Sequence, residues 1–282
     1  MAVTATTQTR ALGLRLREIR ESAGLSTRAL ATRLGIDRST ISRWESGNRV
    51  PGTAEVARAL DACGVTGDAR DETLNLSRGQ HEPQWLAVSA GDRSRQLSAL
   101  IDLERKARRI TNVSPSLIPG LLQTSDYARA IMRAAEVPPG EIETRVATRI
   151  GRQEIITGRQ PVELHALIGE AALWQHIGGA TVLADQLRSL LDLSRYEHVT
   201  VQVIPAKAGW NPALEGQFVF LESSLYPPMV HIENRRAGLF FHEDADTAEY
   251  RSAVETVEKT AMSPAASVEL IAGVIKELET TA

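Results

Sequence analysis

Apolar residues recur at helical spacing through the first 80 residues, in short runs that polar residues and glycines interrupt. A spacing of three and four residues places such side chains on one face of a helix. Acceptor side chains that can cap a helix, and glycines that can end one, mark where the runs begin and stop. The pattern predicts five short helices: one capped by Thr9, two between Leu25 and Gly47, one near Ala54 to Ala62, and one from a cap at Asp68 to about Arg78.

The second and third of these helices form a pair with marked ends. Ser26 and Asp37 stand where each helix begins and can accept hydrogen bonds from the free N–H groups of the first turn. Gly35 supplies the backbone freedom needed to leave the first helix of the pair. The apolar residues of the pair are expected to bury one shared face: Leu30, Ala31, Leu34, Ile41 and Trp44.

The outer face of this pair carries side chains that suit DNA. A helix lying in the major groove reads base edges with such residues, which here are Arg38, Ser39, Thr40 and Arg43. Thr27, Arg28 and Asn48 are predicted to approach phosphates. An ordinary amphipathic helix pair would share the apolar face. The caps, the glycine turn and the Trp-Glu-Ser-Gly ending all stand in register, however, and favour a DNA-reading motif.

From about Leu12 to about Leu76 the chain resembles the phage-repressor-like (Xre/Cro) helix-turn-helix family. The resemblance implies that Arg20, late in the first helix, pairs with Glu45 at the end of the recognition helix and braces the two. Arg28 stands where the family often has Gln, and Arg38, Ser39 and Arg43 stand where amides often line the recognition helix. The DNA half-site therefore cannot be copied from a relative.

Helix and strand patterns alternate in the second part of the chain, after a junction predicted at Gly79 to Pro83. The predicted helices are Leu97–Ala107, one capped by Thr124 or Ser125, about Gly140 to Thr157, one capped by Thr181 and reaching about Tyr196, Asp246 to Thr260, and one from Ser263-Pro264 to about Leu278. The predicted strands are 110–113, 162–168, 199–204, 216–221, 229–233 and 238–242. The fold class expected is therefore α + α/β: a five-helix helix-turn-helix domain (1–80) followed by a mixed α/β body (84–282).

Six segments of the body are distinctive: Pro119–Ala128, Arg149–Gln153, Glu170–Leu173, Gly178-Gly179, Gln186-Leu187 and Val201–Pro205. In these segments the body resembles that of a large group of actinomycete regulators, the WhiJ-like proteins. Members join an Xre-type head to a body whose biochemical role is poorly defined. Their genes often accompany one for a small partner protein, an arrangement described as antitoxin-like. The resemblance thus implies a regulator and says little about the chemistry of the body.

Composition and charge fit two ordinary folded domains. The chain has 282 residues, of which 43% are hydrophobic and 24% charged, values that exclude disordered and fibrous classes. The net charge is −3, yet residues 1–80 hold 12 basic and 9 acidic residues against 20 and 26 in the remainder. Cys63 is the single cysteine, so no intrachain disulfide forms, and a core-filling role is expected for it. No run approaches the ~18 apolar residues of a membrane span, so cytoplasmic residence is expected.

Catalytic and metal-binding patterns are weak. The nearest cluster joins His231 and Glu233 to His242, Glu243 and Asp244, on two predicted strands. Alternation along a strand would place His231 and Glu233 on one face, but no motif of a hydrolase, nucleotide-binding or metal-dependent enzyme accompanies them. The expectation is a protein that is not an enzyme and holds neither metal nor cofactor.

A basic stripe in the body offers a candidate ligand or partner site, together with Tyr127. Arg145, Arg149 and Arg152 lie at helical spacing and could receive an anionic ligand or an acidic partner. Ion pairs with the neighbouring Glu141, Glu143 or Glu154 are the favoured alternative. The aromatic residues of the body are expected to line the core or a pocket: Tyr127, Trp174 and Trp210.

The function predicted from these patterns is a sequence-specific transcriptional regulator that binds double-stranded DNA, with a body that receives a ligand or partner signal or holds a dimer. A homodimer is expected because one head offers few base contacts. The last helix could supply the dimer contact or pack on the body's own sheet, through Val268, Ile271, Ile275 and Leu278. The alternative is an antitoxin-like module that sequesters a small companion protein, with DNA binding serving autoregulation.

Overall fold

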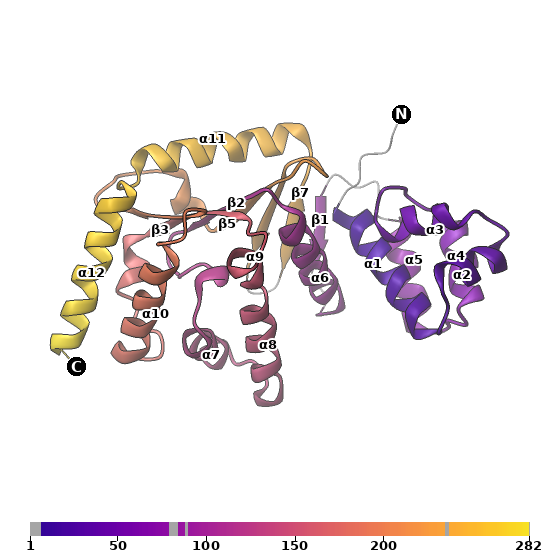
Figure 1. Cartoon of the computed structure of the whole chain (residues 1–282), viewed down its shortest axis with the longest axis horizontal. Helices are drawn as coiled ribbons and strands as arrows, with labels where there is room; N and C mark the ends of the chain where they lie inside the picture. The colour runs from indigo at the N-terminus through magenta and orange to yellow at the C-terminus, as the bar shows by residue number, and fades with distance from the viewer. Residues whose placement is uncertain (1–6, 79–83, 88–89, 235–236, 282) are drawn as a thin grey trace. The chain divides into compact units, whose positions relative to one another are not determined.

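A computed structural model describes residues 7–78, 84–87, 90–234 and 237–281 (Figure 1). The chain forms two compact units: residues 1–103 with 224–246, and residues 104–223 with 247–282. The predicted junction at Gly79 to Pro83 lies outside the described residues. The sequence boundaries at 1–80 and 84–282 follow a different division of the chain and stay a prediction.

Five helices open the first unit, as the apolar spacing predicted. They are α1 (Thr7–Ser22), α2 (Thr27–Leu34), α3 (Arg38–Glu45), α4 (Thr53–Ala62) and α5 (Asp68–Arg78). Two predicted caps are wrong. Thr9 lies inside α1 and is buried, because α1 begins two residues earlier. Asp68 is the first residue of α5, where its carboxylate still favours the positive end of the helix dipole.

These five helices, which we call the head, share one apolar core. Leu12 of α1, Ile41 of α3 and Leu60 of α4 are fully buried there. Burial of each such side chain contributes about 1.5–3 kcal/mol, less the cost of ordering it. The spacing that predicted the helices thus also positions them against one another.

The rest of the first unit contains three short strands and most of a long helix. Strand β7 (Gly238–Phe241) pairs antiparallel with both β1 (Gln84–Ala87) and β6 (Met229–Glu233). Helix α6 (Ala90–Lys106) begins seven residues before the predicted Leu97, and its last three residues belong to the second unit. Strand β1 was not predicted, because four residues directly after a proline carry too little alternation to register.

The second unit is built on four strands in the order β5-β2-β3-β4. Their bounds are β2 (Arg109–Ser114), β3 (Glu163–Gly169), β4 (Val199–Ile204) and β5 (Phe218–Glu222). Strands β2, β3 and β4 are parallel, in a register that aligns Ile110 with Leu164 and Leu164 with Val199, while β5 runs antiparallel to β2. Six consecutive buried residues in β3 are typical of a strand covered on both faces. The predicted mixed α/β body is confirmed.

Six helices accompany this sheet: α7 (Ser125–Ala134), α8 (Pro139–Gly151), α9 (Glu154–Thr157), α10 (Ala180–Leu193), α11 (Asp244–Thr260) and α12 (Pro264–Thr281), with short 3-10 turns η1 (Gly120–Leu122), η2 (Glu170–Leu173) and η3 (Pro212–Glu215). Thr124 caps α7, as predicted, by accepting from the N–H of Tyr127. The single helix predicted over 140–157 is wrong, since α8 ends at Gly151 and α9 is separate. Thr181 is not a cap either, because α10 follows Gly179 and begins at Ala180.

The last helix, α12, packs within its own unit. Ile271, Val274, Ile275 and Leu278 are buried, and α12 contacts α10 and β4 (Figure 1). Ser267 also accepts a hydrogen bond from the backbone N–H of Val203 in β4 at 2.9 Å. Of the two roles considered for this apolar stripe, the structure shows the packing on the unit's own sheet.

Within the described ranges, every helix is too short or too polar to cross a membrane.

Candidate nucleic-acid interface

The helix pair α2–α3 has the geometry that its sequence predicted. Ser26 accepts from the N–H of Ala29 at 3.1 Å, and Asp37 accepts from the N–H of Ser39 at 2.7 Å. Gly35 lies in the left-handed region, with φ 68°, and ends α2. The hydrogen bonds from Ser39 lower the pKa of Asp37 first, and the charge of Arg43 lowers it further. Asp37 therefore stays ionised as a cap at neutral pH.

Helix α3 divides cleanly into two faces. Ile41 and Trp44 are buried in the head, whereas Arg38, Ser39 and Arg43 are exposed. Thr40 is half-buried. Ser42 is exposed beside Arg43 and was missed by the sequence prediction. It lies three residues after Ser39, a spacing that places both serines on one face of the helix. The outer face of α3 thus presents two guanidinium groups and two hydroxyls to solvent.

The arginines of the head fall into two groups. Arg33 donates to the carbonyl oxygen of Ala62 at 2.8 Å, and Arg58 donates to that of Leu34 at 2.6 Å. These two join α2 to α4 by capping helix carbonyl groups. The side chains of Arg28, Arg38 and Arg43 make no hydrogen bond or ion pair within the part of the chain that the structure describes. Only the second group is free to bind an anion.

The residues predicted to approach phosphates lie at the two ends of the helix pair. Thr27 and Arg28 form the first turn of α2, with Thr27 half-buried and Arg28 exposed. Asn48 is exposed in the turn that follows α3. The free N–H groups of a helix start attract an anion, so the first turn of α2 adds a favourable dipole to the Arg28 charge.

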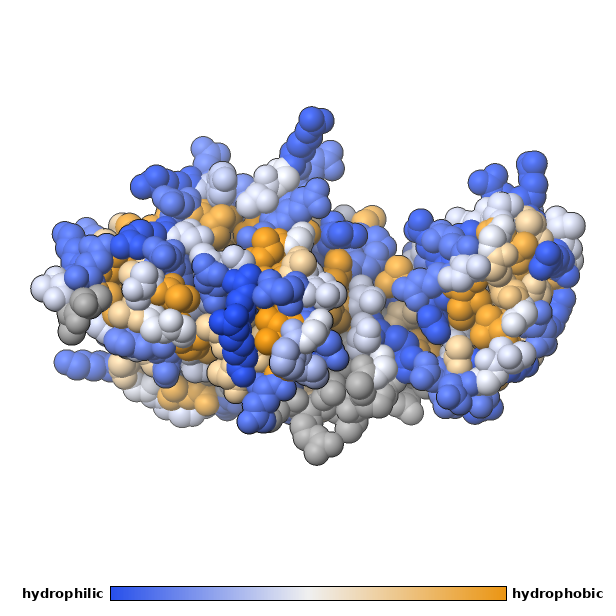
Figure 2. Space-filling view, turned by 90° about the horizontal axis from the view of Figure 1, so that it is seen from below, coloured by the Kyte–Doolittle hydropathy of each residue, from blue (hydrophilic) through white to orange (hydrophobic). Residues whose placement is uncertain are grey.

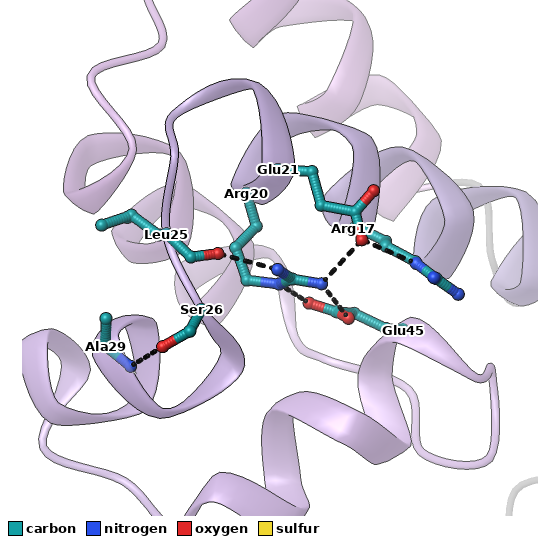
Figure 3. A network of polar contacts seen from close by, with 7 residues as sticks. All are labelled: Arg17, Arg20, Glu21, Leu25, Ser26, Ala29 and Glu45. Carbon is teal, nitrogen blue, oxygen red and sulfur yellow. Dashed lines mark hydrogen bonds and ion pairs between the residues drawn. The ribbon is translucent and has the colours of Figure 1, made fainter.

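Arg20 and Glu45 form a two-pronged ion pair between α1 and α3 (Figure 3). Nε of Arg20 donates to one carboxylate oxygen at 2.6 Å, and a terminal nitrogen donates to the other at 2.9 Å. The other terminal nitrogen donates to the carbonyl oxygen of Leu25 at 2.8 Å. Only 8% and 10% of the two side chains are exposed, and the pairing raises the pKa of Arg20 above its ordinary value. A bidentate pair of this kind fixes the angle between the two helices.

Two glycines let α1 and α3 approach closely: Gly13, which carried no sequence signal, and Gly47 of the Trp-Glu-Ser-Gly ending. A Cβ atom on Gly13 would overlap the carbonyl oxygen of Trp44 and lie 2.9 Å from that of Glu45. Gly47, at φ 73°, would place a Cβ atom 3.0 Å from Cγ of Arg10. The last turn of the recognition helix therefore rests directly on the backbone of α1. A pattern search could not find this contact, because a helix-interior glycine lowers helix propensity without naming its neighbour.

The predicted basic stripe in the second unit is engaged within the fold. Arg145 pairs with Glu141 at 2.7 Å on the surface of α8. Arg149 donates to the side-chain oxygen of Gln123 at 2.9 Å. Arg152 donates to both carboxylate oxygens of Glu104, whose side chain is 2% exposed. Ion pairing with neighbouring glutamates or with acidic residues elsewhere in the body was the favoured interpretation for this stripe. Arg145 pairs with the neighbouring Glu141, and Arg152 pairs with Glu104, which is distant in sequence.

Aromatic residues of the second unit divide differently from the expectation. Tyr127 is fully buried, and burial raises the pKa of its hydroxyl, which accepts from the N–H of Ile118 at 3.5 Å. The expectation of a core or pocket role is wrong for Trp174 and Trp210, which are 39% and 72% exposed. Trp174 directly follows η2 and Trp210 lies in the loop after β4, where alternation gives no indication of burial. On the face shown in Figure 2, apolar residues lie in separate patches among hydrophilic ones.

The histidine cluster of the predicted strands has no metal-binding geometry. His231 is buried, and its ring packs against Phe240 with centroids 4.5 Å apart. Burial lowers the pKa of His242, against the opposing charges of Glu243 and Asp246. Among the residues that the structure describes, no three histidine, cysteine or acidic side chains converge as metal ligands.

Two family models match separate parts of the chain. A model described as a helix-turn-helix domain matches residues 11–73, which include the helix pair α2–α3 and the Arg20–Glu45 ion pair. A second model, described as a domain of unknown function (DUF5753), matches residues 97–273, more than half of the chain. The chain belongs to the DUF5753 family. No curated protein matches it. The helix-turn-helix match indicates that this DUF5753 protein is a DNA-binding regulator.

Proposed function

We propose that this DUF5753 protein is an Xre-type, sequence-specific transcriptional regulator that reads the major groove with α3. The observation that best supports this proposal is that the arginines of the head have two different surroundings. Those that fasten the fold are bonded to carbonyl groups or to Glu45, whereas Arg28, Arg38 and Arg43 are exposed and make no ion pair in the described chain. Free guanidinium groups on an exposed recognition helix suit both base edges and phosphates.

In this proposal Arg38, Ser39, Thr40 and Arg43 approach the bases. An arginine can donate two parallel hydrogen bonds to the O6 and N7 atoms of guanine, which discriminates against the other bases. Thr27, Arg28 and Asn48 hold the backbone phosphates and set the register without reading sequence. Ser42, exposed on the same face, joins the base-contacting set.

We further propose that two copies act together on an inverted repeat. One head offers three or four base-contacting side chains, too few for selectivity against a genome of competing sites. A two-fold dimer would place its recognition helices about one DNA turn apart, so half-site centres are expected roughly 10 base pairs apart or at a multiple of that spacing. Sedimentation of the full chain with and without DNA tests this, and a monomer that protects a single unrepeated site contradicts it.

For the body we propose a regulatory role without catalysis or cofactor, in which it receives a small effector or a protein partner. The antitoxin-like alternative, capture of a small companion protein, is favoured by one observation. Trp210 and Leu214 are 72% and 64% exposed on either side of the buried Asn211 and Ala213, and a rigid aromatic anchor of this kind suits a protein partner. Native mass spectrometry of the protein from its host would separate a bound small molecule from a bound protein. A regulator of the chromosome also implies cytoplasmic residence.

The DNA-binding proposal is tested by selecting sites from a random pool of duplexes with the full chain. We expect enrichment of one sequence. On that sequence, Arg38→Ala and Arg43→Ala should each weaken binding by about 1–3 kcal/mol and relax preference at one position. Arg28→Ala should weaken binding to all DNA similarly.

Arg145→Ala is the matched control, since it removes one exposed arginine from the second unit. Failure to enrich any sequence contradicts the proposed function. Enrichment without an effect of Arg38 or Arg43 leaves DNA binding standing and shows that the docking face is wrong.

A further inference from the structure

Arg10, in the first turn of α1, is buried where the head meets α6 within the first unit. Only 4% of this residue is exposed. One terminal nitrogen lies 3.5 Å from a carboxylate oxygen of Asp102 on α6, and the guanidinium carbon lies 4.7 Å from the centre of the Tyr226 ring. The Tyr226 hydroxyl donates to the carbonyl oxygen of Leu103 at 2.7 Å. Arg10 thus links α1 to α6 and to the segment before β6.

Burial of the Arg10 guanidinium contributes little to the stability of the fold. A guanidinium has five N–H donors, yet Nε of Arg10 is buried and has no hydrogen-bond partner among the described residues. The ion pair with Asp102 is single and long for a hydrogen bond. Removing a charge from water costs more than one such contact returns. A buried ionic group of this kind is better explained by the geometry that it specifies.

The opposite side of Arg10 supports the end of the recognition helix. Gly47 lies two residues after the end of α3, and a Cβ atom there would lie 3.0 Å from Cγ and 3.3 Å from Cα of Arg10. The turn is closed by hydrogen bonds from Gly47 to the carbonyl oxygen of Trp44 and from Arg49 to that of Arg43, both at 3.1 Å. A shift of Arg10 therefore displaces the turn that ends α3.

Elsewhere the head and α6 are held less tightly. They leave a cleft of about 220 Å³ lined by residues of α1, α5 and α6. At this cleft Arg95 of α6 pairs with Glu72 of α5 at 2.9 Å, and the Glu72 side chain is 47% exposed. Exposed pairs of this kind contribute little. Of these two ion pairs between the head and α6, the pair of Arg10 with Asp102 is the more buried.

We propose that Arg10 is a positioning residue for DNA reading, which transmits the placement of α6 to the recognition helix through Asp102, Arg10 and Gly47. Helix α6 contains residue 97, where the DUF5753 match begins. A change in the body that moves α6 would therefore alter the base-reading surface. The inference rests on the proposed DNA-binding function. It assigns a role to an arginine that touches no DNA.

The decisive variant is Asp102→Asn in the full chain, measured on the duplex selected from the random pool. Loss of a negative charge should by simple electrostatics leave DNA binding equal or tighter. Through the contact with Arg10 we expect the opposite, a loss of affinity of about fivefold or more, the lower end of typical coupling between sites. Arg10→Ala should weaken binding similarly, and the double variant should be no weaker than the weaker-binding single variant.

Glu72→Gln is the matched control, because it also removes one negative charge and also breaks an ion pair with α6. It should bind DNA as the wild type does. Hydrogen exchange supplies a readout without DNA: in Asp102→Asn the amides of Gly47 and Arg49 should exchange faster than in Glu72→Gln.

Unchanged DNA affinity and unchanged exchange at Gly47 and Arg49 in folded Asp102→Asn would overturn the proposal. If that variant does not fold, Tyr226→Leu tests the same contact with both charges kept, and the same two outcomes apply. A wild type that binds no DNA contradicts the proposed function instead, and the exchange comparison still decides whether Arg10 couples α6 to the turn after α3.

Discussion

Helix-borne arginines have opposite surroundings in the two units. On α3 of the head, Arg38 and Arg43 are exposed, and their side chains form no ion pair within the described residues. On and just after α8 of the second unit, Arg149 bonds to Gln123 and Arg152 bonds to the buried Glu104. Helical spacing alone therefore does not tell whether a basic stripe awaits a partner. The partner residue, brought from elsewhere in the chain, decides it.

The largest loss of stability is expected on substitution of Glu104 in the second unit. Glu104→Ala should leave Arg152, itself 15% exposed, without its carboxylate and destabilise the protein by about 3–5 kcal/mol. Arg145→Ala should cost about 0–1 kcal/mol, since its pair with Glu141 is exposed. Denaturant unfolding of both variants measures the difference. Equal losses of stability in the two variants would show that the buried pair of Arg152 with Glu104 stabilises the protein no more than an exposed surface pair does.

A smaller effect is expected where α1 and α3 touch. Gly13→Ala should destabilise the head by about 1–3 kcal/mol, because the new methyl overlaps backbone oxygens that cannot move freely. Gly273→Ala in α12 is the control, since no atom lies within 4 Å of its Cβ position and alanine favours a helix. Thermal unfolding of the two variants should shift in opposite directions. A stabilised Gly13→Ala would mean that the two helices are not in direct contact.

The brace between Arg20 and Glu45 sharpens the comparison with Arg152 and Glu104. A double-mutant cycle with Arg20→Ala and Glu45→Ala should give a coupling energy of about 0.5–3 kcal/mol, and either single variant should be less stable than the double variant. Arg145 and Glu141, more than half exposed on α8, provide a reference pair whose coupling should be about 0.5 kcal/mol or less. Coupling near zero for the brace as well would show that the observed contact contributes nothing to stability.

The smallest expected effect is a pH dependence in the second unit. His165 is buried, its Nε2–H donates to Gln202 at 2.7 Å, and its Nδ1 lies 3.0 Å from Glu258. Burial lowers the pKa of His165, Arg109 lowers it further, and Gln202 and Glu258 oppose the shift. The folded state thus binds this proton less readily than the unfolded state. The resulting stability is present above the unfolded pKa of about 6.5 and is lost as the pH falls through the folded value.

Melting temperatures between pH 7.5 and 5.5 test this sign. Wild type should lose more stability on acidification than His165→Gln, whereas His176→Gln, at an exposed position, should behave as the wild type does. A His165→Gln variant with an unchanged pH profile would show that this histidine does not contribute.

Local signals predicted the head well, and the family resemblance supplied the Arg20–Glu45 pair, but other long-range contacts were missed. The caps Ser26 and Asp37 and the turn at Gly35 depend on neighbours within three residues, which the sequence displays directly. Strands 199–204 and 229–233 were placed at their observed bounds by β-branched residues. Glu104 and Arg152, by contrast, are 48 residues apart, and nothing in either segment points to the other. The exposure of Trp210 likewise depends on how a loop leaves its strand end.

The difference between the bonded and the exposed arginines of the head also bears on how the preferred DNA sequence of such a protein could change. Arg20, Arg33 and Arg58 join the helices on their inner side through Glu45 and two carbonyl groups, and the side chains of Arg38 and Arg43 make no ion pair within the described residues. In the proposed docking, substitutions at Arg38, Ser42 and Arg43 should therefore alter the preferred operator at little cost in folding, whereas Ser39 also bonds to the Asp37 cap. This face would then allow related regulators to acquire new DNA sites by exchange of three side chains.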